Sequence, residues 1–349
     1  MQVDAPARLA SVLQGEGWRL PDREARSIRY VLGAALAYCF VIVALSDFPA
    51  RMFAESAGSY FSIAAVAALF VASAYALVCL FDEGARENAA SRIIFLGAAA
   101  IVVAITFSSF IIFKQVLLPE RGFVWDRTFM EIGRALFFGE SAWVVTHRLL
   151  GLTATRFLDS LYSLWVVLAF GCPLVAMAAF RDSRKRLRIL IGWVAAWVAI
   201  GTVAAWIFAS AGPCYFNAVV GPDTSYALLD QRLADLARAA ADRGTPIGAV
   251  PVQHTLLAAY QSGDYLLAGG ISAMPSMHVA LAVLLALAGF EYSRTCGAAM
   301  TVYAVLIWIG SVHLGWHYFV DGPVAALLMF GLWKLAGLAA QRLLGEAPA

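Results

Sequence analysis

Long apolar runs constrain this chain more than any other feature of its sequence. Eight stretches each have the ~17–25 residues that an α-helix needs to cross the hydrocarbon core of a bilayer. They cover residues 28–46, 60–81, 93–117, 156–180, 187–210, 275–291, 297–315 and 318–342. Only 14% of the residues are charged, whereas soluble domains carry about 25%. The sequence therefore predicts an all-α, polytopic membrane protein with about eight transmembrane helices.

The distribution of Lys and Arg predicts which side of the membrane each connection faces. Basic residues gather before the first run and in the links after the second, fourth and sixth runs. With an even number of spans, these segments all lie on one side, which the positive-inside rule makes the cytoplasm. The residues concerned are Arg8, Arg19, Arg23, Arg26, Arg29, Arg86, Arg92, Arg181, Arg184, Lys185, Arg186, Arg188 and Arg294. Both termini are then cytoplasmic, and the net charge of +2 gives no sign of a nucleic-acid partner.

Two long connections, at about 118–155 and 211–274, are predicted to face the outside. In the first, four apolar residues recur at helical spacing and predict a helix in the membrane interface: Phe129, Ile132, Leu136 and Phe137. In the second, Asp223 or Thr224 is predicted to cap a helix that ends near Gly244. Its apolar stripe consists of Leu229, Leu233, Leu236 and Ala240. This helix is either a solvated support on the membrane or a lid over a lipid-facing site.

All five histidines fall on the predicted outer side: His147, His254, His278, His313 and His317. His278 ends the segment Gly-Gly-Ile-Ser-Ala-Met-Pro-Ser-Met-His, residues 269–278. Pro275 is predicted to begin the sixth helix, with Ser276 and His278 in its first turn. Free backbone N–H groups and the helix dipole favour an anion there, and a phosphate group is the obvious ligand.

His317 and Asp321 lie four residues apart, on one helix face, in the segment Ser-Val-His-Leu-Gly-Trp-His-Tyr-Phe-Val-Asp-Gly-Pro, residues 311–323. A carboxylate one turn away can hold the proton on one ring nitrogen and leave the other free to act as a nucleophile or base. The predicted topology places this segment on the same side as the start of the sixth helix. The two histidine motifs are therefore expected to converge.

Pro-Ser-Met-His followed by His-Tyr-Phe-Val-Asp resembles the second and third signature motifs of the type 2 phosphatidic acid phosphatase superfamily. Met277, where the usual pattern has Gly, together with His-Tyr-x-x-Asp, is closer to the branch containing the fungal inositolphosphorylceramide synthases. The trio of two His and one Asp also resembles that of the sphingomyelin synthases. Two further features resemble a stretch that is common in bacterial members of that branch. They are the segment from Asp126 to Gly139, and Asp159 together with Tyr162.

The resemblance implies a role for each matching residue. His317 would attack phosphorus and form a phosphohistidine, and Asp321 would orient it. His278 would protonate the leaving alkoxide and then deprotonate the acceptor, while Ser276 would help to bind phosphoryl oxygens. Positioning and electrostatics supply most of the catalysis in such a transfer. Neither a metal nor another cofactor is implied.

The chain departs from the family pattern in its basic residues. Ser311 stands where the third motif has Arg, and the region of residues 210–215, where the first motif is expected, contains no base. Lys114 and Arg121 have the first motif's K-x6-R spacing but sit at the end of the third helix, two spans too early. Other candidates to neutralise a phosphate are Arg127, Arg134, Arg232, Arg238, His254 and His313. His313 is the first choice, because it lies one helical turn before His317.

These features predict a membrane lipid phosphotransferase that moves a phospho-headgroup, with phosphoinositol as one possibility, from a phospholipid donor to a lipid or alcohol hydroxyl. The alternative is a phosphatase for phosphatidic acid or a polyprenyl phosphate, and a non-catalytic lipid transporter is a third reading. The predicted organisation is a cytoplasmic segment at 1–27, two additional helices at 28–92 and a six-helix catalytic domain at 93–349. High Ala and Arg content points to a bacterial inner membrane with a periplasmic active site. The oligomeric state stays open.

Overall fold

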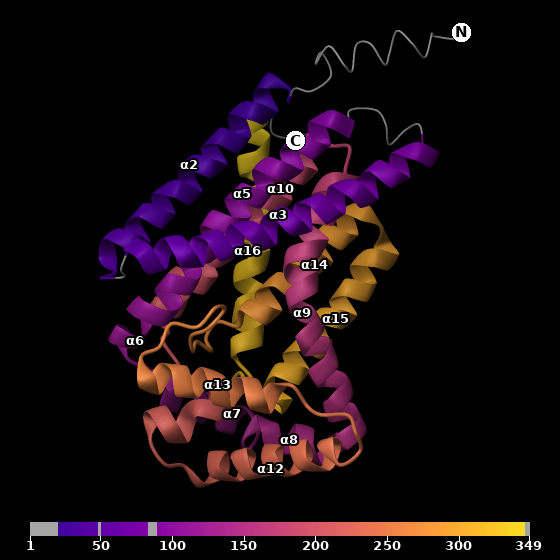
Figure 1. The fold of residues 1–349 in the computed structure, drawn as a ribbon. Coiled ribbons are helices and arrows are strands. Elements are labelled where there is room, and N and C mark those ends of the chain that lie inside the picture. Colours follow the sequence, from indigo (N-terminus) through magenta and orange to yellow (C-terminus); the bar gives the residue numbers. More distant parts are fainter. Residues whose placement is uncertain (1–19, 48–49, 83–88, 346–349) are drawn as a thin grey trace, which may run out of the picture.

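The structure, a computed structural model, describes residues 20–47, 50–82 and 89–345, and every regular element in these ranges is a helix (Figure 1). Most of the predicted cytoplasmic segment 1–27 lies outside the described residues, as do Arg8, Arg19 and Arg86. The all-α membrane fold predicted from the apolar runs is confirmed.

Seven helical stretches of the described chain are long and apolar enough to cross a membrane. The first two are α2 (Asp22–Leu45) and α3 (Ala50–Phe81). The third is α5 (Ala89–Ile112), which continues through the π-helical turn η1 (Phe113–Leu117) into α6 (Leu118–Arg121). The fourth is α9 (Leu152–Ala179), and the fifth joins α10 (Ser183–Ala195), π-helical η2 (Ala196–Ala204) and α11 (Ala205–Ile207). The last two are α15 (Arg294–His313) and α16 (Asp321–Leu344).

The remaining predicted span, the sixth along the chain, is α14 (Met277–Tyr292), which has only 16 residues. At 1.5 Å per residue it is about 24 Å long, shorter than the ~30 Å hydrocarbon core of a bilayer. Ser276 caps this helix and Pro275 lies one residue further out, so the prediction that Pro275 begins the helix is wrong. The segment before α14 is irregular and largely buried. The start of the His278 motif therefore lies inside the bundle.

Four short helices form a layer across one end of the bundle (Figure 1). They are α7 (Asp126–Leu136), α8 (Ala142–Leu149), α12 (Thr224–Ala241) and α13 (Ala249–Ser262). The predicted cap of α12 is confirmed, because Asp223 accepts hydrogen bonds from the N–H groups of Ser225 and Tyr226. Its predicted apolar stripe is buried as well. In α7, by contrast, the buried side runs through Phe129 and Met130, and Ile132 is exposed.

The two ends of the described chain meet at one end of the bundle. Arg23 at the start of α2 donates a hydrogen bond to the carbonyl of Leu344 at the end of α16 (3.2 Å). The neighbouring Glu24 forms an ion pair with Arg186 at the start of α10, and both side chains are fully buried. This contact fastens α2 to the bundle. The additional helix α3 crosses the bundle obliquely and contacts both α5 and α9 (Figure 1).

Candidate active site

His317 and Asp321 form a hydrogen-bonded pair at the start of α16. His317 Nδ1 lies 3.1 Å from Asp321 Oδ2, which also accepts the backbone N–H of Tyr318 at 3.0 Å. An ionised carboxylate can only accept, so the pair requires the ring proton on Nδ1 and leaves Nε2 with a free lone pair. Both side chains are buried, with exposed fractions of 5% and 0%. The geometry prepares His317 to act as a nucleophile or base.

His278, in the first turn of α14, lies beside His317. Their ring centroids are 5.9 Å apart and the planes are inclined at 64°. The His278 ring stacks on Tyr162 of α9 at 4.3 Å, and Trp165 one turn further along packs on it at 4.1 Å. Trp165 Nε1 also donates to the carbonyl of His278 (3.0 Å). The two motifs thus converge, as their predicted topology required, and aromatic side chains fix the orientation of His278.

Ser276 connects the two motifs through its backbone. Its N–H donates to the carbonyl of Asp321 (3.3 Å), and its Oγ accepts the N–H of Val279 as the cap of α14. The side chain is fully buried and does not line the cavity described below. Ser276 therefore holds the motifs in register, and the geometry does not place its hydroxyl where it could contact a phosphate.

The segment at residues 210–215, where the first family motif was expected, acts as a scaffold. Ser210 accepts hydrogen bonds from the N–H groups of Ala273 and Met274, just before the His278 motif. The N–H of Cys214 donates to the carbonyl of Gly315, just before His317 (2.8 Å). Gly212 has φ of +103°, and a Cβ there would lie 2.6 Å from the carbonyl oxygen of Trp316. A glycine is required at this crossing, which leaves no room for a basic side chain.

Asp126 at the start of α7 anchors this scaffold. Its buried carboxylate accepts the N–H groups of Ala211 and Gly212 and, at 2.7 Å, the hydroxyl of Tyr318 next to His317. Burial raises the pKa of this carboxyl above its ordinary value, and the three hydrogen bonds act in the opposite direction. Asp159 acts similarly at a second point, because it accepts the N–H groups of Gly248 and Ala249 at the start of α13. These carboxylates, noted in the sequence, support the site through backbone groups.

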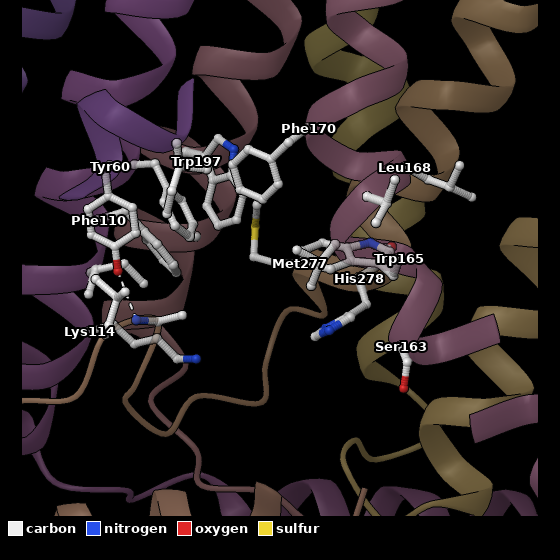
Figure 2. A pocket seen from close by; sticks show the side chains of 18 of the residues that line it. Tyr60, Phe110, Lys114, Ser163, Trp165, Leu168, Phe170, Trp197, Met277 and His278 are labelled. Carbon is white, nitrogen blue, oxygen red and sulfur yellow. Dashed lines mark hydrogen bonds between the residues drawn. The ribbon is translucent and has the colours of Figure 1, made fainter. Parts of the chain in front are cut away.

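A cavity of about 1250 Å³ opens from the two histidines into the bundle. Lys114, in the π-helical turn η1, is the only Lys or Arg that lines it among the described residues. Figure 2 shows the Lys114 side chain on one wall and the His278 ring on the opposite wall, with Phe110, Trp197, Phe170 and Met277 beyond them. The Lys114 ammonium has no carboxylate partner in the described part of the chain. An anion between these walls would supply one.

The other basic candidates lie outside the cavity. His313, the first choice from the sequence, hydrogen-bonds through its two ring nitrogens to Thr155 and Thr146 and packs on His147 at 4.0 Å. Arg134 pairs with Asp223, and Arg238 with Asp235. Arg127 lies over the ring of Phe216, while Arg232, His254 and Arg121 do not reach the cavity either. Lys114, whose K-x6-R spacing with Arg121 lies two spans too early for the first family motif, is thus the basic candidate that lines the cavity in the described chain.

In the described ranges, no group of three or more His, Cys, Asp or Glu side chains is arranged to hold a metal ion. Comparison with protein families gives one match, to the PAP2 superfamily over residues 127–335. No curated protein and no solved structure matches the chain. The family match covers more than half of the sequence and contains both histidine motifs, but it does not extend to the inositolphosphorylceramide synthase branch. The chain belongs to the PAP2 superfamily, whose helical membrane bundles support phosphatase- or phosphotransferase-type activity on lipids.

Proposed function

We propose that this protein is a lipid phosphotransferase, which moves a phosphodiester headgroup from a glycerophospholipid to a hydroxyl of a second lipid or an alcohol. The observation that carries the proposal is the single Lys of the cavity, placed opposite the two histidines. A phosphate monoester carries close to two negative charges at neutral pH, and a phosphodiester carries one. A site with a single basic side chain of this kind matches the phosphodiester better than the monoester of a phosphatase substrate.

The proposed reaction has two balanced steps. His317 Nε2 attacks phosphorus, the bond from phosphorus to the diacylglycerol oxygen breaks, and protonated His278 gives its proton to the leaving alkoxide. The acceptor hydroxyl then loses its proton to His278 and attacks phosphorus, and the bond to His317 breaks. Asp321 keeps the His317 proton on Nδ1 throughout, and Lys114 neutralises the phosphoryl oxygens.

The walls of the cavity support a lipid or alcohol acceptor over water. Most of its lining consists of apolar and aromatic side chains, with Asp159, Ser62, Ser163 and Ser272 among the polar exceptions. Such walls exclude water from the phosphohistidine and admit an apolar alcohol. Four residues of the lining, Tyr162, Trp197, Tyr215 and Trp316, have buried polar atoms without a partner in the described chain. A headgroup that bears hydroxyls, such as phosphoinositol, would supply partners. We also infer that the site faces the outside of a bacterial inner membrane, because the basic residues cluster in the opposite connections.

A transfer assay tests this proposal. Purified protein is incubated with a phospholipid labelled in its headgroup phosphate, with and without diacylglycerol or ceramide. We expect label in a new lipid with wild type and none with His317→Ala or His278→Ala. His254→Ala is the matched control, because His254 is exposed and outside the cavity. Release of free phosphate or phosphoalcohol without a new lipid would replace the proposal by the phosphatase function. Equal turnover by wild type and His317→Ala would refute the mechanism.

A further inference from the structure

The cavity extends from the histidines along the membrane-spanning part of the bundle, between α3 and α9. Its far lining includes residues from Tyr60 to Val71 on α3 and from Ser163 to Val175 on α9. Six apolar lining residues are also more than half exposed on the outside of the bundle: Ile63, Val66, Phe70, Val166, Val167 and Val175. The cavity is therefore open sideways, where a membrane-embedded chain meets the bilayer.

The depth of this opening matches one leaflet of the membrane. The twelve helical steps from Ser163 to Val175 correspond to about 18 Å along the axis of α9. Half of the hydrocarbon core of a bilayer is about 15 Å thick. The polar end of the cavity carries Lys114 and His278. The deeper part of the cavity is lined by rings such as Phe107, Phe170 and Trp197. This arrangement of one charged end and an apolar groove is that of a lipid in a single leaflet.

We propose that the groove between α3 and α9 is a binding site for an acyl chain of the phosphate-bearing lipid substrate, which enters sideways from the bilayer. The proposal rests on the proposed function for the identity of the lipid as the donor. Continuity with the catalytic cavity carries it: a phosphate placed between Lys114 and His278 leaves its acyl chain to continue along the groove. Below the polar end, the groove offers no charged side chain that a second kind of ligand would need.

Hydrogen bonds tie the α3 wall to the catalytic end of the cavity. The hydroxyl of Tyr60 accepts the N–H of Ala268 (2.8 Å), and Ser56 bonds to the hydroxyl of Tyr265. In η1, which continues α5, Gln115 next to Lys114 exchanges two hydrogen bonds with the backbone of Leu266, both 2.9 Å. The segment that leads to the His278 motif is thus held by both helices. The groove and the phosphate end keep a fixed register, so the groove can measure chain length from the reacting phosphorus.

The wall helix α3 lies outside the part of the chain that matches the family. The family match begins at residue 127, so α3 and Lys114 both lie outside it. Substrate selection by α3 is therefore a property that membership in the superfamily does not imply.

Photolabelling tests the groove without requiring turnover. His317→Ala protein in phosphatidylcholine nanodiscs receives a trace of phosphatidylinositol with a diazirine near the end of one acyl chain. We expect label on residues 62–71 and 166–175 in excess of the label on α2, whose exposed Phe40 reports ordinary lipid contact. Ala67 lines the groove, whereas Ala65 is exposed and outside it. Ala67→Phe should remove the excess and Ala65→Phe should not, with Ala67→Leu as a milder variant should the Phe variant fail to fold.

Kinetics give a second readout in the active protein. Ala67→Phe should lower the ratio of kcat/KM for a long-chain donor to that for a short-chain donor about 15-fold, which corresponds to two methylene groups left outside the groove. Label in the groove no stronger than on α2, or equal losses with Ala65→Phe and Ala67→Phe, would overturn the proposal. Groove labelling in a protein that transfers no headgroup would instead refute the proposed function and leave the acyl-chain site standing.

Discussion

Replacement of Lys114 by Met tests two effects of this residue. One is the destabilisation of the fold by its buried charge, and the other is its contribution to headgroup transfer. Met keeps the length of the side chain and removes the charge. A hydrogen bond from a charged group is worth ~1.5–3 kcal/mol, so Lys114→Met should lower kcat/KM for headgroup transfer about 10- to 150-fold. The ammonium opens on an apolar cavity without a carboxylate partner in the described chain. Its removal should therefore stabilise the empty protein, on the order of 1 kcal/mol.

Lys114→Met is thus expected to lower the transfer activity and to raise the stability of the empty protein. Transfer is measured with a headgroup-labelled phospholipid, and stability by thermal unfolding of the same preparation in detergent without substrate. Arg121→Gln is the matched control, since Arg121 has the K-x6-R spacing from Lys114 but is exposed and away from the cavity. It should change neither quantity. Activity of Lys114→Met within twofold of wild type, or a lowered unfolding temperature, would refute this account of Lys114.

Three further substitutions test how the site is held. Asp126→Asn should lower the free energy of unfolding by about 2–4 kcal/mol, because an amide cannot accept from two backbone N–H groups and the Tyr318 hydroxyl at once; thermal unfolding measures it, and an unchanged midpoint would contradict it. Glu24→Leu should cost about 3 kcal/mol by leaving Arg186 buried without its carboxylate. Its headgroup transfer, assayed below the unfolding transition, should stay normal. Gly212→Ala should abolish both transfer and folded yield, since its Cβ meets a backbone carbonyl and its φ is positive; normal yield would count against the scaffold.

The membrane fold was predictable because its main signal is local. Each span needs only its own apolar length, and the cap at Asp223 needs only a side chain followed by a helix. The convergence of His278 and His317 was predictable from the parity of the spans. The short α14 and the buried segment before it were not, because an apolar run does not reveal at which residue a helix begins.

Lys114, the residue that we propose to bind the phosphate, could not be identified from spacing alone. His313 stands four residues before His317, but α15 ends at His313, and Thr146 and Thr155 contact its two ring nitrogens. Lys114 reaches the cavity because the helix formed by α5 and η1 packs against α9 and η2, and one sequence does not specify such contacts between distant segments. The signal that could have identified it was present: a lone Lys inside an otherwise apolar span is costly and is a functional-site hypothesis by default.

The bonds of Asp126 have a consequence for the order in which the protein is made. Its partners at residues 211 and 212 leave the ribosome long after it, and the hydroxyl of Tyr318 follows 192 residues behind. Until then, a carboxylate destined for burial has no donors to satisfy it, so the first half of the chain cannot settle into its final packing. The catalytic half thus completes the fold as well as the site. A chain that stops before residue 211 therefore lacks all three donors of this carboxylate.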